Sequence, residues 1–240
     1  MRKFIISIDA GTTSNRSILF DLKGKPVFSS QKEFTQYFPK SGWVEHDPDE
    51  IWRTTVKTLK DVIQKAKKLR GKILNIGITN QRETTVLWDK RTGKPVYNAI
   101  VWQDRRQEEF CAKLRKQNKD TMIFNKTGLL IDSYFSGTKI KWVLDNVPKA
   151  KKLMNSNQLL FGTIDSFLIW RFTKGKVHAT DATNASRTMI YNISSNKWDD
   201  AILKLLNIKK HILPEVKDCA DNFGQTHSSI TGKPIPCLLY

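Results

Sequence analysis

The sequence predicts a mixed α/β fold that opens with an antiparallel β-meander in a mixed sheet flanked by helices. Residues 3–8, 16–22 and 26–34 have the apolar patterning of three successive strands, and Lys23-Gly24-Lys25 is a tight turn between the last two. Strand-like and helical runs are interspersed further along, which is typical of α/β domains. An opening hairpin also differs from the strand, loop and helix order that begins P-loop and dinucleotide-binding folds.

The later elements follow in order. Asp47-Pro48-Asp49-Glu50 predicts a helix start, because it combines a capping carboxylate, a proline at the first helical position and acid in the first turn. Leu69-Arg70-Gly71 ends this helix. We expect the remaining strands at 72–79, 84–89 and 96–102, and at Val177 and 187–193 around Thr180-Asp181. We expect the remaining helices at 104–117, 139–144, 165–172 and 198–206. This order favours an actin-like, ribonuclease-H-like domain.

Composition indicates a cytoplasmic globular protein. The 240 residues are 39% hydrophobic, which is enough to bury a core. No apolar run approaches the length of a signal peptide or a membrane span, so we expect no membrane partner. Cys111, Cys219 and Cys237 lie far apart and predict neither a disulfide framework nor a zinc site. The histidines lack metal-ligand spacing and are assigned no role: His46, His178, His211 and His227.

The net charge of +18 raises the alternative of a nucleic-acid partner, because Lys and Arg neutralise phosphates. The lysines are spread along the whole chain, however, and no basic tail or known nucleic-acid module accompanies them. We therefore favour a solvated, lysine-rich surface over a nucleic-acid partner. A homo-oligomer is compatible with the sequence.

A hydroxyl-rich loop, Asp9-Ala10-Gly11-Thr12-Thr13-Ser14, links the first two predicted strands. A carboxylate at a strand end can hold Mg²⁺ through water, a glycine lets backbone N–H groups approach phosphate oxygens, and the three hydroxyls add donors. Arg16, just beyond, could bind a terminal phosphate bidentately. A polar hairpin turn uses the same residue types, but this loop is longer than a hairpin requires. We interpret it as a phosphate-binding loop without a Walker lysine.

Three further positions predict a site for a small polyol. Arg82 and Glu83, between two apolar strands, offer adjacent donors and acceptors for hydroxyl groups, although they could instead form a surface ion pair. Trp102 is the last residue of a predicted strand and could place its indole against the C–H surface of a ligand, or lie in the core. Tyr134 precedes a predicted helix, where its phenol could contact a ligand or only water.

Taken together, these segments resemble the FGGY family of carbohydrate kinases, which includes kinases of glycerol, xylulose, gluconate and fuculose. The similar runs are long, cover nearly the whole chain and are most similar to the glycerol branch of the family. They lie at residues 9–16, 41–48, 77–85, 98–103, 134–142, 160–163, 180–188 and 213–216.

The resemblance implies a bilobal, actin-like enzyme that transfers the γ-phosphoryl group of ATP to glycerol with Mg²⁺. It places Asp9 at the magnesium ion, through water. The residues that it places at the nucleotide phosphates are Thr12, Thr13, Ser14 and Arg16, after Gly11. Those that it places at glycerol are Arg82, Glu83 and Tyr134 for the hydroxyls and Trp102 for the carbon chain. Ala10 departs from the glycerol branch, in which Gln is common here.

The resemblance also assigns the general-base aspartate and the adenosine pocket to a second domain. We therefore expect residues 1–234 to form the first domain, residues 235–240 to begin the second, and no catalytic base in this chain. The chain alone should turn glycerol over negligibly, with a separate second domain as its partner. Its apolar end, Cys237-Leu238-Leu239-Tyr240, is expected to fray or to pair with a neighbouring chain.

Two other functions remain open at this point. One is a kinase for another polyol or sugar, which would share the phosphate loop but hold a different substrate. The other is a vestigial, non-catalytic module that keeps an actin-like fold and serves in binding or interaction.

Overall fold

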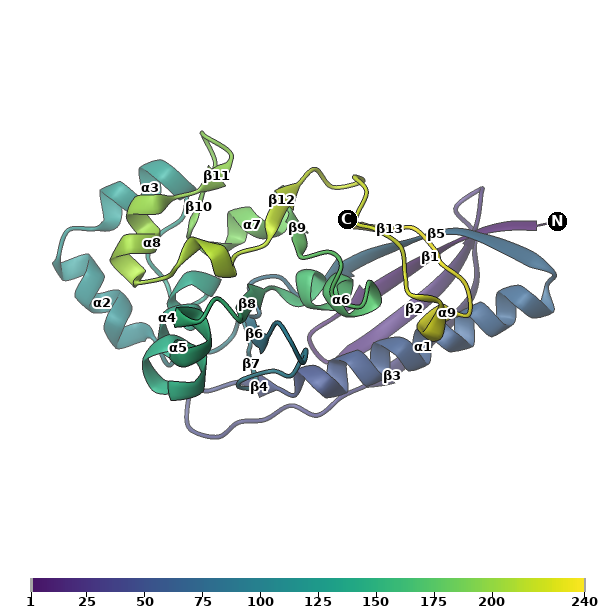
Figure 1. The fold of residues 1–240 in the computed structure, drawn as a ribbon, viewed down its shortest axis with the longest axis horizontal. Coiled ribbons are helices and arrows are strands. Elements are labelled where there is room, and N and C mark those ends of the chain that lie inside the picture. Colours follow the sequence, from purple (N-terminus) through teal and green to yellow (C-terminus); the bar gives the residue numbers. More distant parts are fainter. Residues whose placement is uncertain (1, 240) are drawn as a thin grey trace.

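The computed structural model describes residues 2–239. A twisted sheet and one long helix form one end of an elongated molecule, and shorter helices form the other (Figure 1). Two hydrophobic cores correspond to these two ends, one beneath the sheet and one among the shorter helices. The first strand runs from the outer tip of the sheet toward the middle of the molecule, so its carboxyl end lies where the two ends meet (Figure 1).

The five-stranded sheet has the order β13-β5-β1-β2-β3. Strands β1 (Arg2–Ala10), β2 (Ser14–Asp21) and β3 (Pro26–Glu33) form an antiparallel meander, and β5 (Gly71–Asn80) joins β1 in parallel. Every second residue of β1 is buried from Phe4 onward, as the period-two pattern requires. The predicted meander in a mixed sheet is therefore confirmed.

Helix α1 (Pro48–Lys68) covers one face of this sheet (Figure 1). The Asp47 side chain caps the helix by accepting a hydrogen bond from the backbone N–H of Asp49, and Pro48 occupies the first turn. Ile51, Leu59 and other apolar residues of the buried face share one core with β1. This helix begins and ends where the sequence predicts.

The end of the described chain corrects one prediction. Strand β13 (Cys237–Leu239) does not fray but pairs in parallel with β5, with Cys237 opposite Ile76 and Leu239 opposite Ile78. Both Cys237 and Leu239 are fully buried, because the apolar strand finds a partner within its own chain. Tyr240 lies outside the described residues. The domain boundary after residue 234 stays a prediction.

The other end of the molecule combines helices with short strands. Helices α2, α4, α6 and α8 confirm predicted helices, whereas α3, α5 and β8 were not predicted. The remaining elements are β4 (Glu45–His46), β6 (Val86–Asp89), β7 (Ala99–Ile100), α2 (Glu108–Lys116), α3 (Asp120–Thr127), α4 (Ser136–Asn146), α5 (Pro148–Asn155), β8 (Leu159–Gly162), α6 (Ile164–Phe172), β9 (Ala179–Asp181), α7 (Ala182–Ala185), η1 (Ser186–Thr188), β10 (Tyr191–Asn192), β11 (Lys197–Trp198), α8 (Asp200–Leu206), η2 (Lys210–Ile212), β12 (Glu215–Lys217) and α9 (Ser228–Thr231).

Two predicted strands are mostly wrong. The strand expected at 96–102 is reduced to β7, because the chain bends at Val96 and Tyr97 directly after an isolated bridge between Pro95 and Trp88. The side chains of Tyr97 and Asn98 then donate hydrogen bonds to the Glu45 carboxylate. The strand expected at 187–193 starts as the 3₁₀ helix η1. Met189 then adopts a left-handed φ of 63°, which a strand cannot accommodate, so only β10 remains.

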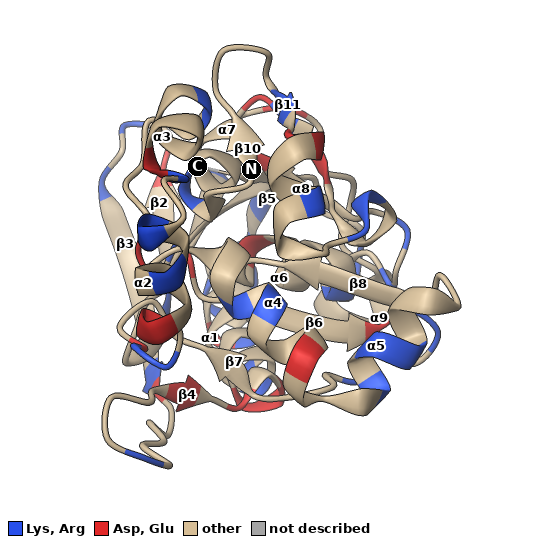
Figure 2. Ribbon diagram, turned by 90° about the vertical axis from the view of Figure 1, so that its left-hand side faces the viewer, with Lys and Arg blue, Asp and Glu red and all other residues tan. Residues whose placement is uncertain are grey.

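Charged residues are distributed over the helical end of the molecule. Figure 2 shows Lys and Arg on α2, α4, α5 and α8, interspersed with Asp and Glu. This distribution is typical of a solvated surface. Within residues 2–239, no helix combines the length and the apolar character needed to cross a membrane.

Candidate functional site

The candidate phosphate loop, residues 9–14, is the connection between β1 and β2. The backbone N–H of Gly11 donates to the carbonyl of Ser14 (3.0 Å), which closes the loop into a tight turn. A Cβ atom at Gly11 would lie 3.1 Å from that same carbonyl oxygen, so the turn favours glycine. Thr13 is exposed and Thr12 and Ser14 are partly exposed, so all three hydroxyls lie at the surface of the loop.

Asp9 and Arg16 face each other across the base of this loop. They are opposite residues of the β1–β2 ladder, and an Arg16 guanidinium N–H donates to the Asp9 carboxylate at 3.0 Å. The side chains are 38% and 46% exposed, respectively. Both charges are therefore accessible to a ligand that enters from solvent.

Arg82 and Glu83 follow β5, whose carboxyl end lies beside that of β1 because the two strands are parallel. The backbone N–H of Gln81 donates to the Ala10 carbonyl at 2.8 Å, which holds this segment directly against the phosphate loop. Arg82 is exposed, and within residues 2–239 its side chain makes no hydrogen bond or ion pair. Its guanidinium is thus available to a ligand.

Glu83 has the opposite environment. Its side chain is only 3% exposed, and its carboxylate accepts a hydrogen bond from Arg187 Nε at 2.6 Å. The backbone at Glu83 adopts a left-handed φ of 61°, and its carbonyl accepts a hydrogen bond from the Ser136 hydroxyl at 2.9 Å. A non-glycine residue in this conformation is unusual, and such strain is concentrated at functional sites.

Trp102 connects the two groups of candidate residues. Its indole N–H donates to the Thr12 hydroxyl at 3.1 Å, and its ring lies 5.5 Å from that of Tyr134. The structure therefore brings the predicted phosphate-binding and polyol-binding residues together in one place. Arg187 completes this cluster, because its guanidinium carbon lies 5.6 Å from the centroid of the Tyr134 ring.

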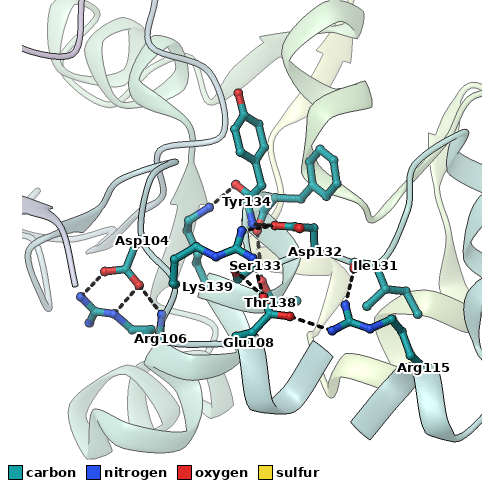
Figure 3. A network of polar contacts seen from close by, with 12 residues as sticks. Asp104, Arg106, Glu108, Arg115, Ile131, Asp132, Ser133, Tyr134, Thr138 and Lys139 are labelled. Atoms are coloured by element: carbon teal, nitrogen blue, oxygen red, sulfur yellow. Dashed lines mark hydrogen bonds and ion pairs between the residues drawn. The ribbon is translucent and has the colours of Figure 1, made fainter. Parts of the chain in front are cut away.

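The backbone of Tyr134 is held by two charged side chains, one from the preceding loop and one from α4 (Figure 3). The Asp132 carboxylate accepts its N–H at 2.7 Å, and the Lys139 ammonium donates to its carbonyl. Burial lowers the pKa of Lys139 to about 7, although the carboxylates of Asp104 and Glu83 act in the opposite direction. No sequence pattern pointed to Lys139 or Arg187, although both lie in segments that resemble the family.

A second buried carboxylate lies next to the site. Asp165, at the start of α6, accepts hydrogen bonds from the hydroxyls of Thr163 and Thr180, the second at 2.6 Å. Burial raises the pKa of Asp165 to about 6. Asn80, at the end of β5, also donates to it at 3.4 Å. The sequence pattern did not indicate a role for Asp165, because acidic residues are common in the first turn of a helix.

The described residues contain no group of three or more His, Cys, Asp or Glu side chains arranged to hold a metal ion. A magnesium ion nevertheless fits the chemistry of the loop, because Mg²⁺ in phosphoryl-transfer sites keeps several waters and uses few protein carboxylates. Asp9, partly exposed at the end of β1, is the carboxylate that could serve.

Comparison with known proteins identifies relatives of this chain. Residues 4–234 match the family model described as the FGGY family of carbohydrate kinases, N-terminal domain. A glycerol kinase of Chelativorans sp. is 56% identical over 99% of this chain and 48% of its own length. The chain thus spans about half the length of the curated relatives that it matches.

Solved structures agree with these sequence relatives. A Plasmodium falciparum glycerol kinase with ADP superposes with a TM-score of 0.94 at 38% identity, over 99% of this chain and 48% of that one. A gluconate kinase from Lactobacillus acidophilus superposes with a TM-score of 0.87 at 26% identity, over 99% of this chain and 47% of that one. The predicted actin-like α/β fold class is confirmed.

Proposed function

This chain belongs to the FGGY family of carbohydrate kinases, and on that premise we propose that it is the glycerol-binding and phosphate-binding half of an ATP-dependent glycerol kinase. The observation that carries the proposal is the contact between Trp102 and Thr12, which joins a polyol-binding side to a phosphate-binding side at hydrogen-bond distance. A kinase needs this juxtaposition, because phosphoryl transfer depends mainly on positioning and charge stabilisation.

The phosphate side would bind the β- and γ-phosphates of ATP. Gly11 lets the backbone approach closely, and the hydroxyls of Thr12, Thr13 and Ser14 donate to phosphate oxygens. Arg16 would neutralise charge, and Asp9 would hold Mg²⁺ through water, where the ion offsets the charge of the phosphates. Because the Asp9–Arg16 pair is solvent-exposed, breaking it costs little free energy. Each side chain could therefore leave the other and bind a group of the ligand.

The polyol side would orient glycerol. Arg82 donates to hydroxyl oxygens, the Glu83 carboxylate accepts from hydroxyl groups, and the Tyr134 phenol can do either. The Trp102 ring would cover the carbon chain. In the reaction, a terminal hydroxyl oxygen of glycerol forms a bond to the γ-phosphorus as the bond from that phosphorus to the β-γ bridging oxygen breaks. ADP is released, and the hydroxyl proton would pass to the general base that the resemblance assigns to the second domain.

We expect phosphoryl transfer itself to require a second domain, which the resemblance gives as the source of the general base. Half of a cleft would position only part of each substrate and leave the γ-phosphate open to water. A cytoplasmic location is proposed because the reaction consumes ATP.

Glycerol is favoured over a sugar because the glycerol kinase relative is 56% identical, against 26% for the gluconate kinase structure.

The test is glycerol binding by the purified 240-residue chain, followed by NMR, for the natural sequence and for Arg82→Ala. We expect the Arg82 variant to bind glycerol roughly ten- to hundredfold more weakly, because the charged hydrogen bonds from Arg82 to glycerol are lost. The substitution should not disturb the fold, because it leaves no other side chain unpaired. Arg53→Ala, which removes another exposed arginine, on α1, is the control and should bind normally. Equal affinity in all three proteins would contradict the proposed role of Arg82.

A coupled ADP-release assay separates the kinase from the non-catalytic alternative. With ATP, Mg²⁺ and glycerol, we expect the chain alone to show negligible turnover and a mixture with a separately produced second domain of a relative to recover it. If the mixture stays inactive although both parts are folded and the chain binds glycerol, a non-catalytic binding module becomes the better description.

A further inference from the structure

Besides the direct hydrogen bond between Trp102 and Thr12, a chain of hydrogen bonds through the side chains of Gln36, His46, Gln81 and Thr84 connects the phosphate loop to Trp102, and no role assigned above uses these four side chains. One arm begins at the Thr12 carbonyl, which accepts from Gln36 Nε2 at 3.1 Å. The Gln36 side-chain oxygen contacts His46 Nε2 at 2.6 Å. His46 Nδ1 in turn contacts Gln81 Nε2 at 3.3 Å. The arm thus runs from the phosphate loop through β4 to the segment that carries Arg82.

The second arm continues from Gln81 to the polyol side. The Gln81 side-chain oxygen accepts from the Thr84 hydroxyl at 3.0 Å, and that hydroxyl accepts from the backbone N–H of Trp102 at 3.3 Å. Because the Trp102 indole N–H donates to the Thr12 hydroxyl, the chain of hydrogen bonds closes into a ring at the residue where it began. Gln81 Nε2 also donates to the Gly11 carbonyl at 3.1 Å, which adds a second anchor in the phosphate loop.

We propose that Gln36, His46 and Gln81 are positioning residues that couple the phosphate loop to the polyol-binding residues, so that a ligand at one side orients the other. This inference rests on the proposed function and adds to it a set of residues that touch neither substrate. It also predicts that phosphate-like and polyol ligands bind interdependently, in the sense of a coupling free energy between two sites.

The direction of every bond in the ring is consistent with one protonation state. If His46 is neutral and carries its proton on Nε2, it donates to the Gln36 oxygen and accepts at Nδ1 from the Gln81 amide. Each glutamine then donates only through its side-chain NH₂ and accepts only through its side-chain oxygen. A charged imidazole would instead direct an Nδ1–H at the Gln81 amide hydrogens.

Burial maintains this state. His46 is fully buried, and this desolvation lowers the pKa of its imidazole to about 4, which keeps the imidazole neutral at physiological pH. The edge of the imidazole also packs against Phe34, whose ring centroid lies 5.0 Å away. Gln36 is only partly buried, so it can be replaced with less risk to folding.

The first measurement requires no ligand. In the ¹⁵N-labelled chain, the indole N–H signal of Trp102 is assigned by its loss in Trp102→Phe, and its exchange with solvent is then measured. We expect exchange to be roughly three- to tenfold faster in Gln36→Leu and in His46→Gln, because the Thr12 end of the ring loosens. Thr35→Ala, the exposed neighbour that binds Glu50 instead, should exchange like the natural chain.

The second measurement determines coupling. Glycerol affinity is measured with and without magnesium tripolyphosphate, which can occupy a phosphate loop without needing an adenosine pocket. We expect tripolyphosphate to change the glycerol Kd roughly fivefold or more in the natural chain and in Thr35→Ala, and about twofold or less in Gln36→Leu. If Gln36 only stabilised the fold, Gln36→Leu would weaken the binding of both ligands but leave unchanged the ratio of the glycerol Kd values measured with and without tripolyphosphate.

The outcomes separate the two proposals. If neither ligand binds the natural chain, the proposed function is wrong for this chain. If indole exchange is unchanged in both Gln36→Leu and His46→Gln, or if the coupling ratio is the same in Gln36→Leu as in the natural chain, the positioning role of the ring is wrong.

Discussion

Two arginine–carboxylate pairs lie at the candidate site, and they differ mainly in their access to water. Asp9–Arg16 is 3.0 Å long, with side chains 38% and 46% exposed. Glu83–Arg187 is 2.6 Å long, with side chains 3% and 31% exposed. The first pair belongs to the proposed phosphate side and the second to the proposed polyol side, so the two halves of the candidate site differ in how far they are buried.

This difference has a physical consequence. An exposed pair contributes little to stability, so its partners can separate to bind phosphate and Mg²⁺ at little cost. A buried carboxylate is costly without its partner, so Glu83 must keep Arg187 whether or not a ligand is present. We therefore expect the phosphate side to rearrange on binding and the polyol side to be held in place beforehand.

The largest expected effect is that of breaking the buried pair. Arg187→Met keeps much of the side-chain volume but leaves the Glu83 carboxylate unpaired, so the free energy of unfolding should fall by about 3 kcal/mol. Chemical denaturation monitored by tryptophan fluorescence measures this change. Glycerol affinity should fall as well, because the carboxylate that would accept from a hydroxyl loses its orientation.

A double variant distinguishes pairing from packing. In Arg187→Met combined with Glu83→Gln, the buried charge is removed together with its partner, and most of the lost stability should return. Glycerol binding should remain weak, because the carboxylate is still missing. If the double variant is as unstable as Arg187→Met alone, the buried charge is not the cause.

The next largest effect is expected in the pH dependence of stability, because His178 is a titratable side chain that folding buries. Burial lowers the pKa of His178 to about 4 from its usual 6.5. Below pH 6.5 the unfolded chain gains a proton that the folded chain resists, so this contribution to stability is complete above pH 6.5 and declines as the pH falls toward 4. Between pH 7 and 4.5 the loss from this one group is about 2 kcal/mol.

His178→Gln tests this expectation, because a glutamine can still donate to the Phe161 carbonyl that His178 contacts at 2.7 Å. The variant should lose less stability than the natural chain over that pH range, as measured by denaturation at each pH. His227→Gln is the control, since His227 is exposed. Burial raises the pKa of Asp165 to about 6, which opposes the trend equally in all three proteins. Parallel pH profiles for the natural chain and His178→Gln would show that His178 is not responsible.

The same contrast explains which parts of the molecule could be predicted. The phosphate loop is one short segment between two strands of clear alternation, so its place at the end of the sheet follows from local sequence. The partner of Glu83 lies 104 residues away, on η1, and no spacing rule connects them. Likewise, the end strand β13 was misjudged because the edge that it joins is formed by β5, far earlier in the chain.

The hydrogen-bonded set of Gln36, His46 and Gln81 could not be predicted from the sequence for a related reason. His46 lacks metal-ligand spacing, and its partners lie far from it in the sequence: Gln36 in the loop before β4 and Gln81 directly after β5. Neutral polar residues gain a role only when folding aligns their donors and acceptors. In contrast, Arg82 and Trp102 could be singled out, because a charge or an indole between apolar strands is conspicuous in the sequence alone.

The smallest effect on stability, and the sharpest test of the comparison, is expected at the exposed pair. Arg16→Ala should change the free energy of unfolding by less than about 1 kcal/mol, because an exposed ion pair contributes little. Magnesium tripolyphosphate should nevertheless bind roughly tenfold more weakly, because a guanidinium available to phosphate has been removed. Lys57→Ala, which breaks a similarly exposed pair with Asp61 on α1, is the control and should leave tripolyphosphate binding unchanged. If Arg16→Ala instead destabilised the fold as much as Arg187→Met, the two pairs would be equivalent, and exposure would not predict which side of the site rearranges when a ligand binds.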